Sequence, residues 1–225
     1  MRSMVIPRFL FAVVGVLFGF ATNALAGPPL ICHAIEIGHA KSLPPIDWNS
    51  SSTGGYALKN LSRDTLAILD SDPSVLVRME TLRRATIYAR HDPATARELL
   101  LKLRARADRS ETYGHHDALS WFDVGYLAEA YQQWMGKNDA NPAAGLDGYA
   151  WIRRAIRLGG GDAEMEFAAA LVTLHGPERA HREHISKAMA GTRGDALLAQ
   201  NLASRFYRQT VSEVLSQPTS KEAAR

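Results

Sequence analysis

The amino-acid sequence predicts an all-α protein. From Tyr56 onward, apolar residues recur at the three- and four-residue spacings that place side chains on one face of a helix. Glycines, prolines and Asp-Pro pairs separate these stretches, and no stretch alternates apolar and polar residues as a half-buried strand does. The chain has 225 residues, 46% hydrophobic and 22% charged, which excludes a disordered or fibrous protein.

The first 26 residues have the features of a secretory signal peptide. Arg2 and Arg8 give a positive start, a largely apolar run covers residues 9–21, and Ala24-Leu25-Ala26 precedes Gly27 as a cleavage site. The run is shorter than the roughly 20 residues of a membrane-spanning helix, so we favour cleavage over an uncleaved anchor. We therefore expect a periplasmic or secreted protein with no stable membrane insertion after cleavage.

The charge balance gives no reason to expect a nucleic-acid partner. Cleavage removes two arginines, which leaves 24 basic and 23 acidic residues and a net charge of +1. Basic residues do cluster locally and are compatible with an anion site or with solvated helix faces. Acidic residues are interleaved among them, so we favour solvated faces. The basic cluster comprises Arg83, Arg84, Arg90, Arg97, Lys102, Arg104, Arg106 and Arg109.

Residues 27–55 are rich in proline, glycine and serine, and predict an extended N-terminal arm. A helical domain is expected over residues 56–208 and a flexible tail over residues 209–225. Asp92-Pro93 is predicted to open one helix and Asp72-Pro73 another, because Asp caps orphan N–H groups and Pro loses no hydrogen bond in a first turn. The predicted helices cover residues 58–69, 76–89, 93–103, 117–135, 146–158, 163–174, 178–190 and 195–207.

An internal repeat has an offset of 33 residues. Residues 151–156, 161–163 and 168–170 are matched by residues 184–189, 194–196 and 201–203. The pattern resembles tetratricopeptide-like repeats, especially the Sel-like subfamily, in which a Trp-containing helix ending in Gly precedes Asp-Ala and a second helix.

The resemblance implies a right-handed solenoid of helical hairpins. Gly125, Ala170 and Ala203 would then be the small residues that let helix backbones approach. The sequence departs from the family at Ala128 and Thr173, where an aromatic residue is usual, and residues 136–145 break the period. An irregular helical bundle is the alternative.

The arm contains Cys32, the only cysteine, followed by His33 and His39. No internal disulfide is available to it, and three fates are open: a buried thiol, an intermolecular disulfide, or a copper or zinc ligand with the two histidines. Residues 28–44 also look like the opening of a group of exported bacterial proteins of unknown role. That likeness implies only that the arm belongs to the folded protein.

Other histidines and the tryptophans favour structural roles. His181 and His184 lie three residues apart, with His175 upstream, but the repeat places His184 where Trp151 lies, which favours packing. His115-His116 precedes Asp117, whose carboxylate is better explained as a helix cap. The four tryptophans are predicted to pack between helices: Trp48, Trp121, Trp134 and Trp151.

No nucleophile elbow, zinc-protease motif, phosphate loop or dinucleotide fingerprint is present in the sequence, so we expect no enzymatic activity and no cofactor. The sequence predicts an exported helical-repeat scaffold that binds a protein or peptide partner through its concave face. The alternative is an exported metal- or thiol-active protein that uses the arm with Cys32, His33 and His39.

Overall fold

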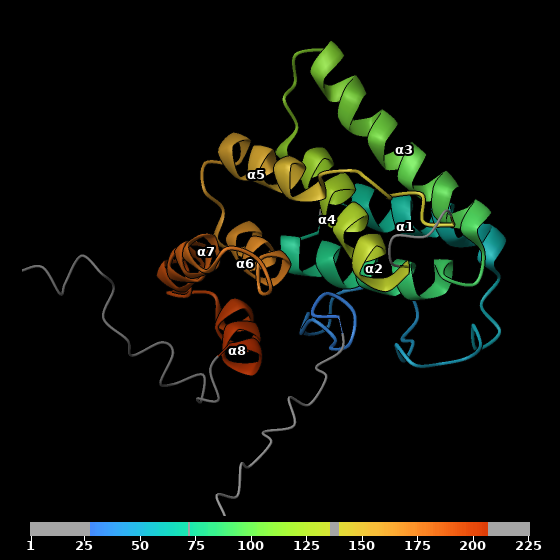
Figure 1. The fold of residues 1–225 in the computed structure, drawn as a ribbon, viewed down its shortest axis with the longest axis horizontal. Coiled ribbons are helices and arrows are strands. Elements are labelled where there is room, and N and C mark those ends of the chain that lie inside the picture. The colour runs from blue at the N-terminus through green and yellow to red at the C-terminus, as the bar shows by residue number, and fades with distance from the viewer. Residues whose placement is uncertain (1–27, 72, 136–139, 207–225) are drawn as a thin grey trace, which may run out of the picture.

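The computed structural model describes residues 28–71, 73–135 and 140–206, and within these ranges the chain forms helices and no strand. The fold is all-α, as the sequence predicts. A 3-10 turn, η1 (Leu58–Asn60), is followed by α1 (Leu61–Asp70), α2 (Val75–Ala89), α3 (Pro93–Thr112), α4 (Ala118–Met135), α5 (Gly148–Leu158), α6 (Ala163–Val172), α7 (Glu178–Ala190) and α8 (Ala196–Arg205) (Figure 1).

Aspartate side chains cap the start of several helices. The Asp92 carboxylate accepts hydrogen bonds from the N–H groups of residues 94 and 95, and Pro93 is the first residue of α3, as predicted. Asp162 and Asp195, which the 33-residue repeat aligns, each accept from the N–H three residues ahead, at the starts of α6 and α8. The Asp117 carboxylate accepts from the N–H of Leu119, which confirms its predicted capping role in α4.

The start of α2 differs from the prediction. Its capping residue is Ser74, whose hydroxyl accepts a hydrogen bond from the N–H of Val77. The prediction that Asp72-Pro73 opens this helix is therefore wrong. The hydroxyl of Ser74 lies immediately before the first helical residue, in the position from which a short side chain reaches the third N–H. Asp72 itself lies outside the described residues.

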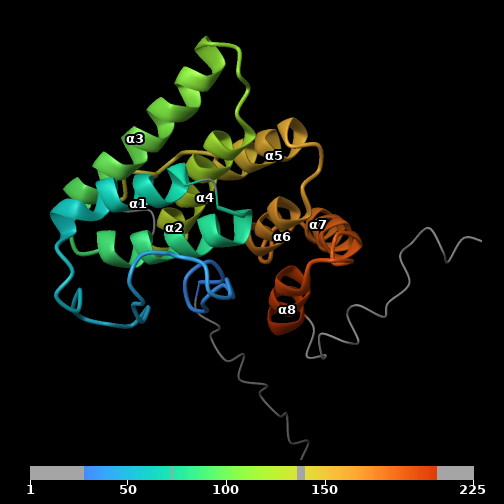
Figure 2. The same cartoon turned by 180° about the vertical axis from the view of Figure 1, so that it is seen from behind.

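The helices pack mainly against their neighbours in the sequence. The pairs α4–α5 and α6–α7 make the most extensive contacts, and α4 also packs against α2 and α3. Figures 1 and 2 both place α6, α7 and α8 on the side of the molecule opposite α1. The C-terminal end of α3 projects from the body in both views, so side chains there lie on an exposed part of the surface.

Two glycines allow α4 and α5 to cross closely. A Cβ atom built on Gly125 would lie 2.8 Å from the carbonyl oxygen of Gly148, and one built on Gly148 would lie 2.6 Å from that of Gly125. Distances this short are not tolerated in a packed interior, so any larger residue must push the helices apart. The predicted role of Gly125 as the small residue at a helix crossing is confirmed.

A buried ion pair lies in the core between α2 and α4. Arg78 and Asp123 are 2.7 Å apart, and their side chains are 2% and 0% exposed. Arg78 also donates hydrogen bonds to the carbonyl groups of Leu69 and Pro73. Burial raises the pKa of Asp123 to about 7, against the lowering effect of the Arg78 charge. Separating or removing either partner would leave a buried charge without its counter-ion. The pair therefore holds the start of α2 against α4.

Residues 28–57 form turns and bends but no helix. This segment lies below α2 and beside α8 in both ribbon views (Figures 1 and 2). It contributes to the core through five buried apolar side chains, Leu30, Ile31, Ile35, Ile37 and Leu43. The folded unit therefore includes this segment as well as the helices.

Two predicted segments, the signal peptide over residues 1–26 and the tail over residues 209–225, lie outside the described residues, as does Tyr207 at the predicted end of the last helix. Across the part of the chain that the structure describes, no helix combines the length and the apolar character that crossing a bilayer requires.

Candidate functional site

The structure does not assemble a metal site from Cys32, His33 and His39. Among the described residues, no three His, Cys, Asp or Glu side chains are grouped so as to hold a metal ion. The Cys32 thiol is half-buried and donates to the carbonyl of Pro28 at 3.0 Å, and burial raises its pKa. His33 and His39 are exposed. The pKa of His33 is still lowered, because nearby protein atoms displace some of its hydration and the charges of Arg205 and Arg83 disfavour its protonated form.

The other predicted histidines have separate partners. The His181 ring contacts the carbonyl of Ala170 through Nδ1 at 2.9 Å, whereas His184 contacts Tyr149 and Glu166. These two histidines therefore do not share a ligand. His115 and His116 lie exposed at the turn between α3 and α4.

A cluster of tryptophan and arginine side chains joins α3, α4 and α5. The Arg104 guanidinium lies 5.3 Å from the ring centroid of Trp121 and 4.8 Å from that of Trp151. Arg154 lies over the same Trp121 ring at 4.1 Å. Glu111 accepts a hydrogen bond from the Trp121 indole N–H at 2.9 Å and pairs with Arg154 at 2.5 Å. We call Arg104, Glu111, Trp121, Trp151 and Arg154 the Trp–Arg cluster.

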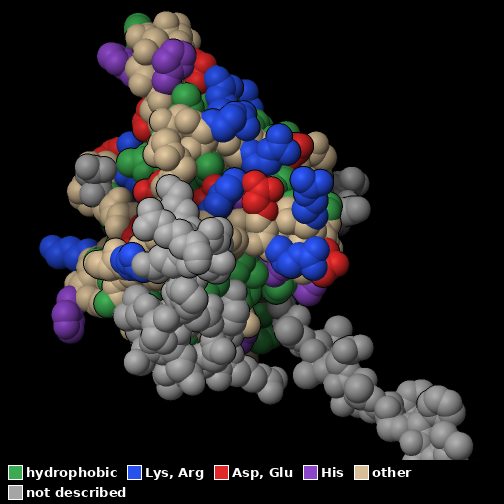
Figure 3. Space-filling model, turned by 90° about the vertical axis from the view of Figure 1, so that its left-hand side faces the viewer, with side chains coloured by type: hydrophobic (Ala, Val, Ile, Leu, Met, Phe, Trp, Pro, Cys, Tyr) green, Lys and Arg blue, Asp and Glu red, His purple; other side chains and the backbone are tan. Residues whose placement is uncertain are grey.

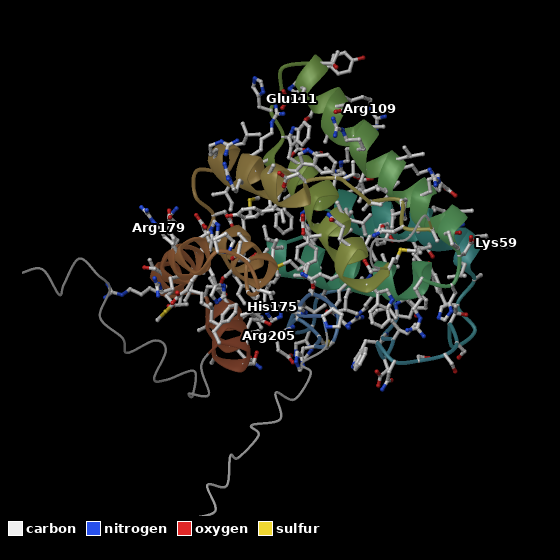
Figure 4. All side chains as sticks on the ribbon, viewed as in Figure 1. Lys59, Arg109, Glu111, His175, Arg179 and Arg205 are labelled. Atoms are coloured by element: carbon white, nitrogen blue, oxygen red, sulfur yellow. The ribbon has the colours of Figure 1, made fainter. Side chains whose placement is uncertain are left out.

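The Trp–Arg cluster reaches solvent. The side chains of Arg104 and Arg154 are 41% and 37% exposed, and Trp151 is partly buried, whereas Trp121 is buried beneath them. The prediction that the tryptophans pack between helices is confirmed for Trp121, which lies between α3 and α5. Figure 4 labels Glu111, a member of the cluster, together with Arg109 on the projecting part of α3.

Positive charge is concentrated on the two helices that flank the cluster. Helix α3 carries five basic and three acidic residues, and α5 carries three arginines and no acidic residue. The two helices together have a net charge of +5, whereas the whole 225-residue sequence has +3. Figure 3 shows Lys and Arg side chains next to Asp and Glu on one face, in line with the predicted solvated helix faces.

Arg83 and Arg84 do not follow that prediction. Arg83 is only 4% exposed and forms an ion pair with Glu80, itself fully buried. Its guanidinium also donates to the carbonyl of Ile31 at 2.8 Å, and Arg84 donates to the carbonyl of Leu43. Arg83 is buried and Arg84 half-buried because both bind the main chain of the N-terminal segment, which helical periodicity does not indicate.

Residues 28–46 form what we call the clasp segment, and α2 holds one side of it. Glu80 accepts a hydrogen bond from the N–H of Ile35 at 2.9 Å, beside the contact from Arg83. The Ser42 and Thr81 hydroxyl groups are 3.0 Å apart, and Tyr88 donates to the carbonyl of Pro44. The side chains of helix α2 therefore bind mainly the main-chain groups of the clasp segment.

Helix α8 holds the other side of the clasp segment. Asn201 accepts from the N–H of Glu36 and donates to its carbonyl, each at 2.9 Å. Arg205 donates to the carbonyl groups of Pro29, His33 and Ala34 at 3.2, 2.7 and 3.1 Å. Figure 4 labels Arg205 where α8 faces this segment. The clasp segment thus ties the last described helix to α2.

A chain of three polar side chains connects α5, α6 and α7. The Tyr149 hydroxyl lies 2.7 Å from Nε2 of His184, and Nδ1 of His184 contacts the buried carboxylate of Glu166. Lys187 lies 3.6 Å from the other oxygen of Glu166. A carboxylate at Nδ1 places the imidazole proton there, so Nε2 of the neutral ring accepts a hydrogen bond from Tyr149. We call these residues the Glu166–His184–Tyr149 relay.

The chemistry of the relay favours a structural bridge over a nucleophile. Burial raises the pKa of Tyr149, so the phenol keeps its proton, whereas a nucleophile needs a lowered pKa. The sequence does contain one signal for this bridge. Glu166 is an acidic residue on an otherwise apolar, buried stretch of α6, and a buried carboxylate requires a partner.

Comparison with family models, with curated proteins and with solved structures found no match to this chain.

Proposed function

We propose that the protein is an exported scaffold of tetratricopeptide-like helical hairpins that binds a protein or peptide partner. Its binding surface is the face formed by α3 and α5 around the Trp–Arg cluster. The observation that carries the proposal is the contact of the exposed Arg104 guanidinium with two neighbouring tryptophan rings, 5.3 Å from the Trp121 centroid and 4.8 Å from the Trp151 centroid.

The repeat supports the scaffold part of this proposal. The positions that the 33-residue offset aligns have equivalent roles, since Asp162 and Asp195 cap the second helix of each unit. The helix crossing at Gly125 and Gly148 has the close approach expected of stacked hairpins. Stacked hairpins present an extended surface to a partner, which gives the function a physical basis.

The composition of the face supports the binding part. Tryptophan, tyrosine and arginine are the residues most enriched at the energetic centres of interfaces. Near the Trp–Arg cluster, Leu101 is 61% exposed on α3 and Tyr113 is 71% exposed just after it. Because the guanidinium groups already stack on the rings, little side-chain entropy remains to be lost on binding.

The charge of the face defines the partner's chemistry. Arg153 and Arg157 are exposed on α5, which contains no acidic residue. A partner surface with carboxylate groups and an apolar or aromatic anchor complements this face. The partner of the proposal is thus an acidic protein or peptide segment.

Selection from a displayed library of random peptides tests this proposal. The protein is immobilised and compared with the double variant Arg153→Glu/Arg157→Glu, which reverses the charge of α5. We expect peptides rich in Asp, Glu and aromatic residues to be enriched on the wild-type protein and lost on the variant. The matched control is Arg179→Glu/Arg182→Glu, the same change of charge on α7, and should retain them. Enrichment of basic peptides, or equal loss in both variants, would contradict the proposal.

A further inference from the structure

The clasp segment is bound to the helices as a peptide ligand is bound to a receptor. Side chains of α2 and α8 contact its main chain at Ile31, Ile35, Glu36 and Leu43, among other positions. Its apolar side chains are buried, with Leu30, Ile31 and Leu43 each at most 2% exposed. The surfaces of α2 and α8 therefore hold this segment through main-chain hydrogen bonds, while its apolar side chains join the core.

The connection between the clasp segment and the helices has the properties of a hinge. Residues 49–55 have the sequence Asn-Ser-Ser-Ser-Thr-Gly-Gly and are mostly exposed. Their hydrogen bonds are largely local, between Ser50, Ser52 and Gly54, and Arg90 provides a tie to the body through the carbonyl of Ser50. Gly54 and Gly55 have φ values of +59° and +85°, and nothing lies within 4 Å of a Cβ built on either.

We propose that residues 28–46 also bind the same surfaces of α2 and α8 on a second copy of this chain, with residues 49–55 opening as the hinge. Every contact between the clasp segment, α2 and α8 is then re-formed between two copies. The exchanged dimer differs from the monomer only in the hinge conformation and in the entropy of association. The partner of these α2 and α8 surfaces is thus a second copy of the protein, independent of the acidic partner proposed for the Trp–Arg cluster.

The hinge glycines offer a way to shift the balance toward the dimer. In the variant Gly54→Val/Gly55→Val, β-branched residues would have to adopt positive φ values in the closed hinge, which strains the monomer. An open hinge in the dimer can adopt extended φ values, so the strain is relieved there. We expect this variant, refolded at high concentration, to give a several-fold larger dimer fraction than the wild type by light scattering.

A matched pair of glycines controls for strain alone. Gly160 and Gly161, in the turn between α5 and α6, have φ values of +70° and +84° and the same open space around them. The variant Gly160→Val/Gly161→Val is strained in the same way but lies outside the hinge. It should therefore leave the dimer fraction at the wild-type level. An equal increase in both variants would overturn the proposal.

A cross-link between copies locates the interface of any dimer. Ala34 in the clasp segment and Ser204 on α8 are both exposed, and Arg205 beside Ser204 contacts the carbonyl of Ala34. Chains with Ala34→Cys and chains with Ser204→Cys, both with Cys32→Ser, are refolded together and treated with a short bismaleimide. A covalent heterodimer is expected from the exchanged form. A dimer without this cross-link, or a monomer at every concentration, would overturn the proposal.

Discussion

Asn201 on α8 holds both the N–H and the carbonyl group of Glu36, each at 2.9 Å, across 165 residues of sequence. This pair of hydrogen bonds joins the first described segment of the chain to its last described helix. Asn201 is fully buried, and both hydrogen bonds are partly buried.

Asn201→Ala should therefore lower the free energy of unfolding by about 1–3 kcal/mol, because two hydrogen bonds of about 0.5–1.5 kcal/mol each are lost. Urea denaturation measures this change, and limited proteolysis should show faster cleavage within residues 28–46. Ser204→Ala, one turn further along α8, removes a hydroxyl that bonds only within its own helix and should have little effect. Equal effects of the two substitutions would argue against the clasp contact.

Gly125→Leu should destabilise the protein by overpacking the α4–α5 crossing. The side chain would meet the backbone of Gly148 and Ile152 within 3.0 Å or less, so the helices must separate. Overpacking of this kind costs about 1–3 kcal/mol or more, measured as a lower midpoint of thermal unfolding. Ala94→Leu, at an exposed position of α3, is the control and should leave the midpoint nearly unchanged. An unchanged unfolding midpoint for Gly125→Leu would contradict the close approach of α4 and α5 at this residue.

Glu164 makes the stability of the protein depend on pH. Its carboxylate accepts the N–H of Leu76 at the start of α2, and burial, with Asp195 and Asp162 nearby, raises its pKa to about 7. In the unfolded chain a glutamate titrates near pH 4.3. The folded state therefore binds the proton more tightly, and the free energy of unfolding falls as pH rises between these two values.

Glu164→Gln removes this titration while keeping an acceptor for Leu76. Relative to the variant, the wild type should lose about 1–3 kcal/mol of stability between pH 4.5 and pH 8. Urea denaturation at several pH values measures the difference. Glu178→Gln, at an exposed position of α7, is the control. Its free energy of unfolding should depend on pH in the same way as that of the wild type. A wild type that gains stability over this range relative to Glu164→Gln would contradict the assigned direction.

The Glu166–His184–Tyr149 relay predicts the tautomer of one histidine. At pH 8 the His184 ring should carry its proton on Nδ1, because Glu166 accepts there and Tyr149 donates to Nε2. The ¹⁵N shifts of the imidazole measure this directly. Tyr149→Phe should cost about 1 kcal/mol by removing the donor, whereas Tyr113→Phe, at a 71% exposed site, should cost almost nothing. A neutral His184 protonated on Nε2 would contradict the relay.

Much of the fold follows from the sequence, because helices depend on local spacing and local caps. The apolar periodicity predicts the helices, Asp92 marks the start of α3, and the resemblance to tetratricopeptide-like repeats implies the close crossing at Gly125. The clasp contacts could not be predicted in this way. They join main-chain groups to side chains such as Asn201 across most of the chain, and no periodicity encodes such a pairing.

The candidate sites follow less closely from the sequence. The three residues of the arm that carry metal-binding chemistry are not assembled into a metal site among the described residues. The Trp–Arg cluster draws on α3, α4 and α5, so its residues become neighbours only when the helices pack. His184 packs between helices, as the sequence predicts, but its partners Glu166 and Tyr149 lie on other helices and are not indicated by the spacing of the histidines.

The most direct test of the proposed function uses the four tryptophan indole N–H signals in a ¹H–¹⁵N spectrum. Trp121 and Trp151 belong to the Trp–Arg cluster, whereas Trp48 and Trp134 pack against each other elsewhere, with ring centroids 5.9 Å apart. Titration with an acidic, aromatic peptide should shift the signals of Trp121 and Trp151 and leave those of Trp48 and Trp134 unchanged. Shifts of the Trp48 and Trp134 signals alone, or of none of the four signals, would contradict binding at this face.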